Sequence, residues 1–224
     1  ISRRRKRDFM GGRGGSSGLP QAYRPASSID EAEKYLSRLT GQQAKFDGIS
    51  LSVANAVNEA LKEVYDRLGE RLDIREVNRV KSDWERYMQA GYQNGVLSIK
   101  GNPSTWEKSA QKNFRDGWLA SGDKYGTLYH EFGHAMWNKL SSSQRSQIDS
   151  IYKRERRKAY ESWMADGGSR SGKSQAEYFG KTLSRYAHTS TQEFFSEAFS
   201  QIMSRRMRPV SREVLSVIDR RRRR

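Results

Sequence analysis

Hydrophobic residues recur at helical spacing along most of this chain from about residue 28 onward. The pattern predicts helices over about 28–39, 51–68, 104–114, 126–140, 148–163, 190–206 and 211–220. The segment 96–100 lies between two glycines and is the strongest strand candidate, with 72–77 a weaker one. We therefore expect an α+β fold that is mainly helical with a small sheet.

The composition changes at both ends of the chain and suggests three regions. Residues 1–27 pass from a basic run into a Gly/Ser-rich stretch and are expected to form a flexible arm, which would suit a domain released from a larger precursor. Residues 28–219 are expected to form one folded domain, and 220–224 an arginine tail. No stretch is long and apolar enough for a membrane span, and the N-terminus lacks the apolar segment of a secretory signal.

Basic residues give the 224-residue chain a net charge of +16, and the runs Arg3–Arg7 and Arg220–Arg224 account for ten of these charges. Such runs are either solvated tails or contacts for nucleic acid or another anionic surface. A third basic cluster lies within 148–163, which predicts a solvent-facing helix or, alternatively, a partner surface. The absence of cysteine excludes disulfides and thiolate metal ligands, and it fits a reducing cytoplasm or a virion.

The pentapeptide His-Glu-Phe-Gly-His at 130–134 is the most informative motif in a chain with only three histidines. On a helix, His130 and His134 lie one turn apart on the same face, so both imidazoles can bind one Zn²⁺. Glu131 lies beside them, where it can act as a general base toward a metal-bound water. The alternative is an ordinary amphipathic helix whose histidines are partly buried and hydrogen-bonded.

A catalytic zinc normally has three protein ligands, so the motif predicts a third one elsewhere. The extended motif with a third histidine is excluded, because Trp137 and Leu140 stand at its glycine and histidine positions. Glu193, near the start of the helix predicted for 190–206, is the candidate. Glu197 lies one turn later and could orient a ligand histidine. Ser190 and Glu193 also form a capping box, in which Glu193 would only cap the helix.

The combination of His-Glu-Phe-Gly-His-Ala at 130–135, Tyr186 and Glu-Phe-Phe-Ser-Glu-Ala-Phe at 193–199 resembles the catalytic domain of anthrax lethal factor and its relatives. These are glutamate-type zincins found in bacterial toxins and in phage-encoded proteins. The resemblance implies that His130, His134 and Glu193 bind zinc and that Glu131 is the general base. It also implies that Tyr186 stabilises the oxyanion and that Glu197 supports a ligand.

The resemblance covers a minor part of the chain, about 126–139 and 184–204, and it leaves several assignments open. Without it, Tyr186 would be interpreted as a packing residue. His188 either lines the cleft or lies on the surface. In zincins a strand that precedes the metal helix commonly borders the cleft, which suggests this role for 96–100. The Gly/Ser-rich loop 166–173 could border or gate the cleft.

These observations predict a zinc-dependent endopeptidase with a zincin-like fold, acting on a protein or peptide substrate. The arginine runs and the phage-associated family suggest a virion protein, in contact with other virion proteins or delivered to the host cytoplasm, by analogy alone. One alternative is a basic structural or DNA-associated virion protein with an inactive zincin domain. Another is a secreted toxin or effector protease.

Overall fold

The computed structural model describes residues 22–80 and 90–219, and it is a mainly helical α+β structure. The strands are β1 (Lys45–Asp47), β2 (Glu76–Arg79), β3 (Ala90–Gln93) and β4 (Val96–Ile99). The α-helices are α1 (Ile29–Thr40), α2 (Leu51–Leu68), α3 (Pro103–Arg115), α4 (Gly126–Lys139), α5 (Ser142–Ala165), α6 (Gln175–Gly180), α7 (Thr191–Met203) and α8 (Pro209–Asp219). Short 3-10 turns span Gly168–Ser171 and Tyr186–His188.

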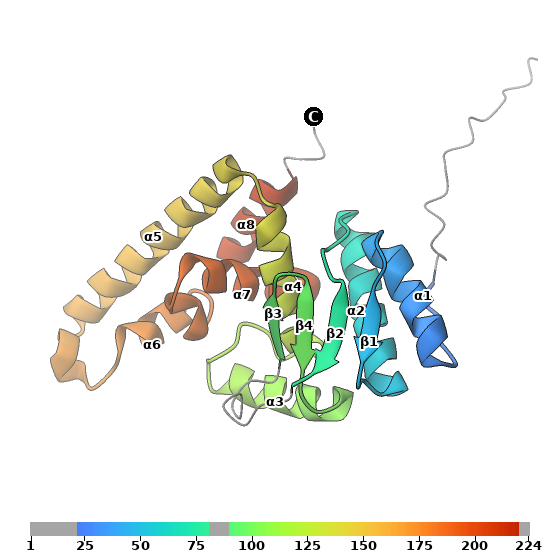
Figure 1. The fold of residues 1–224 in the computed structure, drawn as a ribbon. Helices are drawn as coiled ribbons and strands as arrows, with labels where there is room; N and C mark the ends of the chain where they lie inside the picture. Colours follow the sequence, from blue (N-terminus) through green and yellow to red (C-terminus); the bar gives the residue numbers. More distant parts are fainter. Residues whose placement is uncertain (1–21, 81–89, 220–224) are drawn as a thin grey trace, which may run out of the picture.

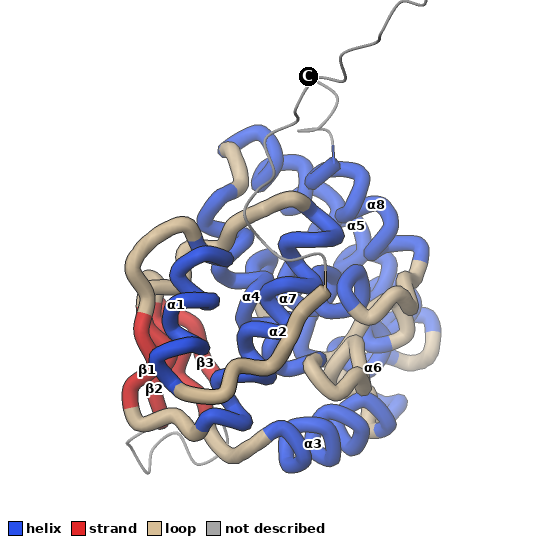
Figure 2. Tube along the Cα trace, turned by 90° about the vertical axis from the view of Figure 1, so that its right-hand side faces the viewer, coloured by secondary structure: helices blue, strands red, loops and turns tan. Residues whose placement is uncertain are grey.

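The four strands form one mixed sheet in the order β1-β2-β4-β3. The strands β1, β2 and β4 are parallel, and β3 is antiparallel to β4 as the outer strand. Alternation places Val77, Leu97 and Ile99 in the core, while Asn78 and Ser98 hydrogen-bond across strands on the other face. The helices lie on one side of the sheet (Figures 1 and 2), which explains why only that face is apolar.

Helix ends follow the capping residues of the sequence. The helices α1 and α2 end at Gly41 and Gly69, both with positive φ. The helix α3 begins earlier than predicted, because Asn102 caps it together with Thr105 and Pro103 occupies the first turn. The helix α5 also begins earlier, since Ser141 and Gln144 form a capping box.

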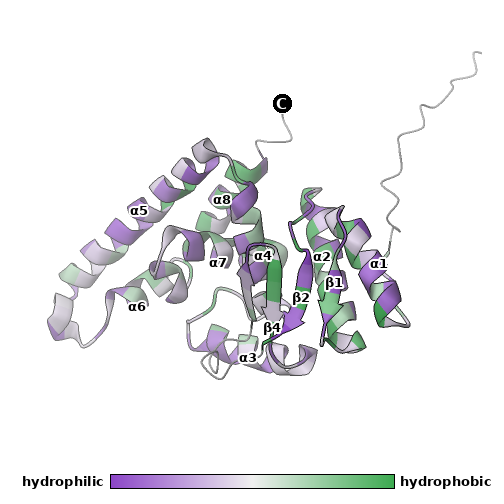
Figure 3. Cartoon of the chain, in the orientation of Figure 1, coloured by the Kyte–Doolittle hydropathy of each residue, from purple (hydrophilic) through white to green (hydrophobic). Residues whose placement is uncertain are grey.

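The helices α4 and α7 lie at the centre of the molecule and carry the predicted metal ligands (Figure 1). The core side chains of α7 include Phe194, Phe195, Phe199 and Ile202, each fully buried. The helix α5 lies along the opposite edge from α1 and carries hydrophilic residues along much of its length (Figure 3). No helix among the described residues is long and apolar enough to cross a membrane.

Candidate metal centre

The two histidines of the 130–134 motif occupy one face of α4, as their spacing predicts. Their Nε2 atoms are 3.1 Å apart, and His130 is buried while His134 is partly exposed. The helix begins after a turn in which the Asp123 carboxylate accepts a hydrogen bond from Tyr125 N at 2.9 Å. This local turn sets the start of α4 and hence the direction of both imidazoles.

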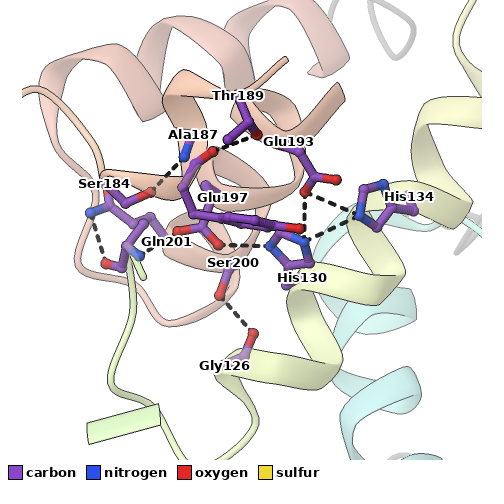
Figure 4. Close-up of polar contacts among 12 residues, drawn as sticks. Gly126, His130, His134, Ser184, Ala187, Thr189, Glu193, Glu197, Ser200 and Gln201 are labelled. Atoms are coloured by element: carbon purple, nitrogen blue, oxygen red, sulfur yellow. Dashed lines mark hydrogen bonds and ion pairs between the residues drawn. The ribbon is translucent and has the colours of Figure 1, made fainter. Parts of the chain in front are cut away.

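Glu193 lies in the first turn of α7 and reaches both histidines (Figure 4). Its Oε2 is 3.0 Å from His130 Nε2 and 3.4 Å from His134 Nε2. The Ser190 hydroxyl accepts a hydrogen bond from Glu193 N, so the serine half of the predicted capping box is present. The Glu193 carboxylate, however, is directed at the histidines, which separates the ligand interpretation from the capping alternative.

The separations of these three atoms are close to those of a tetrahedral metal site, and two of them are slightly shorter. Zinc binds nitrogen and oxygen at about 2.0–2.2 Å, which places two tetrahedral ligands about 3.3–3.5 Å apart. The three observed distances are 3.0, 3.1 and 3.4 Å. In addition, Glu193 Oε2 is buried without a hydrogen-bond donor, although it faces two ring nitrogens. Three lone-pair donors that converge in this way form a candidate metal site, as no other described group does.

Glu197 holds His130, one of the candidate ligands, from the far side. Its Oε1 is 2.7 Å from His130 Nδ1, and its Oε2 accepts a hydrogen bond from Ala120 N. The Glu197 side chain is only 1% exposed, so both of its oxygens are used inside the protein. A proton on Nδ1 shared with this carboxylate leaves the Nε2 lone pair of His130 directed at the triad.

A glycine inside the motif allows α4 and α7 to lie close enough for this geometry. A Cβ placed on Gly133 would lie 2.6 Å from Ser196 Cα, which is backbone and cannot rotate away. One turn further along α7, Ser200 Oγ donates a hydrogen bond to Gly126 O at 3.0 Å. Within His-Glu-Phe-Gly-His, Gly133 therefore serves helix packing, while His130 and His134 serve the site.

The electrostatics of the site favour a positive charge between the ligands. Burial raises the pKa of Glu193, but interaction with the facing His130 and His134 rings outweighs it and lowers that pKa to about 2. Burial lowers the pKa of His130, but the Glu193 and Glu197 carboxylates raise it well above its usual value. A bound metal ion would replace this positive charge.

Glu131 faces the same cleft from α4. It is buried, and desolvation raises the pKa of its carboxyl group above the usual value. The backbone of Tyr92 in β3 acts in the opposite direction and lowers that pKa. The outer strand of the sheet thus lies next to the predicted general base.

The cleft at the metal centre has a volume of about 970 Å³. It is lined by Ala90, Gly91, Tyr92, Asn113, Trp118, Leu119, Thr127, His130, Glu131, His134, Tyr186, Gln192 and Glu193. The strand that borders it is β3, so the prediction for 96–100 was wrong: β4 is a strand, but β2 and β3 flank it. The loop 166–173 does not line the cleft, because it lies at the far end of α5 (Figure 1).

Tyr186 lines the cleft beside the ligands, in the 3-10 turn that precedes α7. Its ring centroid is 5.6 Å from that of His130. Burial and the nearby carboxylates of Glu193 and Glu131 raise the pKa of its phenol to about 12, so it remains a hydrogen-bond donor at neutral pH. His188, by contrast, is partly buried against Phe179 and does not line the cleft.

Several residues at the site were not predicted from the sequence, and three of them shape one wall of the cleft. Trp118 lines the cleft, and Gln201 and Ala120 hold the segment that carries it. All three lie outside the motifs, Trp118 and Ala120 in a segment interpreted only as a loop. The one available signal was an isolated tryptophan among Gly, Ser and Asp residues.

No protein-family model, no curated protein and no solved structure matches this chain. The resemblance to the lethal factor group therefore rests on the short motifs alone, and the metal-site geometry is an independent observation.

Proposed function

We propose that this protein is a zinc-dependent endopeptidase. The observation that carries the proposal is the convergence of His130 Nε2, His134 Nε2 and Glu193 Oε2, with Glu131 and Tyr186 facing the same cleft. A zinc ion held by these three residues would polarise a peptide carbonyl and lower the pKa of a bound water.

Two side chains of the cleft supply the proton chemistry in this proposal. The Glu131 carboxylate accepts a proton from the attacking water and returns it to the leaving amine. Its raised pKa suits a group that must both accept and release a proton. The Tyr186 phenol, which stays protonated, donates a hydrogen bond to the carbonyl oxygen as negative charge develops there.

The open outer strand supports an extended peptide substrate. Within the described residues, β3 pairs with β4 on one side only, and it borders the cleft on its other side. A peptide can add to such an edge by main-chain hydrogen bonds, which would hold its scissile carbonyl next to the ligand triad.

The experiment is metal analysis of the purified protein together with peptide hydrolysis by wild type and Glu131→Gln. We expect one zinc per chain in both proteins and cleavage only by wild type, since Glu131 does not bind the metal in this scheme. Zinc without cleavage would favour the inactive-domain alternative. A metal-free protein that also fails to take up added zinc would contradict the proposal.

The cellular setting of the protein was predicted from its basic ends. The runs Arg3–Arg7 and Arg220–Arg224 lie outside the described residues. Their contact with nucleic acid or an anionic surface, and the virion, host-delivered or toxin setting, stay predictions from the sequence.

A further inference from the structure

The segment 117–120 forms one wall of the cleft and is held by its backbone at four points. Gly117 O accepts a hydrogen bond from Arg185 N at 2.9 Å, and Trp118 O accepts one from Tyr186 N at 3.2 Å. Ala120 N donates to Glu197, and Ala120 O accepts from Gln201 Nε2 at 3.0 Å. The segment is thus tied to the predicted oxyanion residue and to the residue that orients His130.

The Gln201 side chain, which holds Ala120 O, makes hydrogen bonds through both its amide nitrogen and its amide oxygen. Its side chain is 3% exposed, and its Oε1 accepts hydrogen bonds from Arg208 N and Ser211 Oγ at 3.1 and 2.7 Å. Because Glu197 and Gln201 lie one turn apart on α7, they hold both the N–H and the C=O of Ala120. A segment fixed in this way has little freedom to move relative to the metal centre.

The side chain of Trp118 does not contribute to this anchoring. It is 49% exposed in the cleft wall, although a tryptophan in a folded protein is usually largely buried. The Arg185 guanidinium carbon lies 5.8 Å from the ring centroid, and Arg185 also pairs with Glu177 at 3.2 Å. The backbone that carries Trp118 is therefore held in place. Its exposed apolar ring faces the space where a substrate would lie.

The one cation that contacts the Trp118 ring, Arg185, is already paired with Glu177 and does not line the cleft. Among the described lining residues, the only ionisable carboxylate and imidazole groups are those of the ligand triad and Glu131. Lysine, arginine and aspartate are absent from this described lining, although the chain has a net charge of +16. Because Arg185 is paired with Glu177, a charged substrate side chain next to Trp118 would lose hydration without gaining an unpaired partner, whereas an apolar one would be buried favourably.

We propose that Trp118 is the specificity-determining residue of this cleft and selects peptides with a large apolar side chain next to the scissile bond. The proposal rests on the proposed peptidase function, because it names the substrate class of the same site. It predicts that apolar preference depends on one exposed side chain that takes no part in the metal centre.

The test measures binding, so that it does not depend on turnover. Zinc-loaded Glu131→Gln is titrated calorimetrically with acetylated, amidated octapeptides in which Phe, Leu, Ala, Asp or Lys is moved through each position of a neutral sequence. We expect Phe and Leu to bind about 10-fold or more tightly than Asp or Lys at one position, the range typical of an apolar pocket. Adding Trp118→Ala should reduce this ratio to within about 3-fold.

A control variant and a hydrolysis assay distinguish failure of the Trp118 proposal from failure of the peptidase proposal. Tyr160→Ala removes another exposed aromatic residue, which is 46% exposed on α5 and does not line the cleft, and it should keep the ratio. An unchanged ratio in Trp118→Ala, with zinc content intact, would overturn the role of Trp118, as would the failure of every peptide to bind. Absence of hydrolysis by wild type would instead overturn the peptidase proposal, while the binding ratio would still report on Trp118.

Discussion

The α4–α7 pair and the helix α5 both carry ionisable side chains at helical spacing, yet they use them in different ways. On α4 and α7 these side chains are largely buried, and three ligand atoms converge around one point. On α5 the cations are exposed, and several have their own acidic neighbours. These pairs are Lys153–Asp149, Arg154–Glu213, Arg157–Glu161 and Lys158–Glu155.

The number of charged side chains on a helix therefore does not identify a functional site. Each charge pair on α5 lies at the surface, where it contributes little to the free energy of unfolding. Glu193 Oε2, in contrast, is buried and faces two ring nitrogens at 3.0 and 3.4 Å, an arrangement that requires a positive charge, from a protonated histidine or a bound cation. The many exposed charges of α5 therefore indicate a solvated helix. The few buried and converging ones of α4 and α7 indicate a functional centre.

The largest effect should come from removing a ligand. Glu193→Ala takes away the only carboxylate of the triad, so we expect zinc affinity to fall at least about 1,000-fold, more than the loss of an outer partner causes. Competition with a chromophoric chelator measures this affinity. Wild-type affinity in the variant would show that Glu193 only caps α7.

Adding a side chain at the contact between α4 and α7 should have the next largest effect. Gly133→Ala places a methyl group against the Ser196 backbone, and we expect a loss of about 3 kcal/mol in the free energy of unfolding, as in overpacked cores. Urea denaturation measures it. Gly122→Ala is the matched control, because its new Cβ meets only the side chain of Phe114, which is exposed and can yield. Equal stability of the two variants would contradict the close helix contact.

A smaller effect is expected from the residue behind the ligands. Glu197→Gln keeps the shape of the side chain but replaces a carboxylate that bonds His130 and Ala120. Zinc affinity should fall about 10–100-fold, the usual cost of changing such a partner. An affinity loss as large as that of Glu193→Ala would indicate that Glu197 is itself a ligand.

The smallest effect should come from α5. Arg157→Ala removes an exposed i,i+4 pair with Glu161, so the free energy of unfolding should change by less than about 0.5 kcal/mol. Zinc content should stay unchanged. A loss of zinc or of hydrolysis in this variant would link α5 to the site and contradict its role as a solvated helix.

The helices were the predictable part of the fold. Most of them were expected to within a few residues, because caps and apolar periodicity are local signals. The strands β1 and β3 were missed, since each has only three or four residues and β3 contains Gly91. Such short strands depend on pairing with distant neighbours, which the local pattern does not encode.

Residue order alone identifies the candidate chemistry: the spacing of His130, Glu131 and His134 on a helix, and a downstream helix with Glu193 in its first turn. Helical spacing is a local property, so it can be inferred from residue order. Three further relations could not be inferred from residue order: Glu193 turns to the histidines, β3 borders the cleft, and Trp118 forms part of the cleft wall. These relations join residues far apart in the chain, and long-range packing and backbone hydrogen bonds establish them.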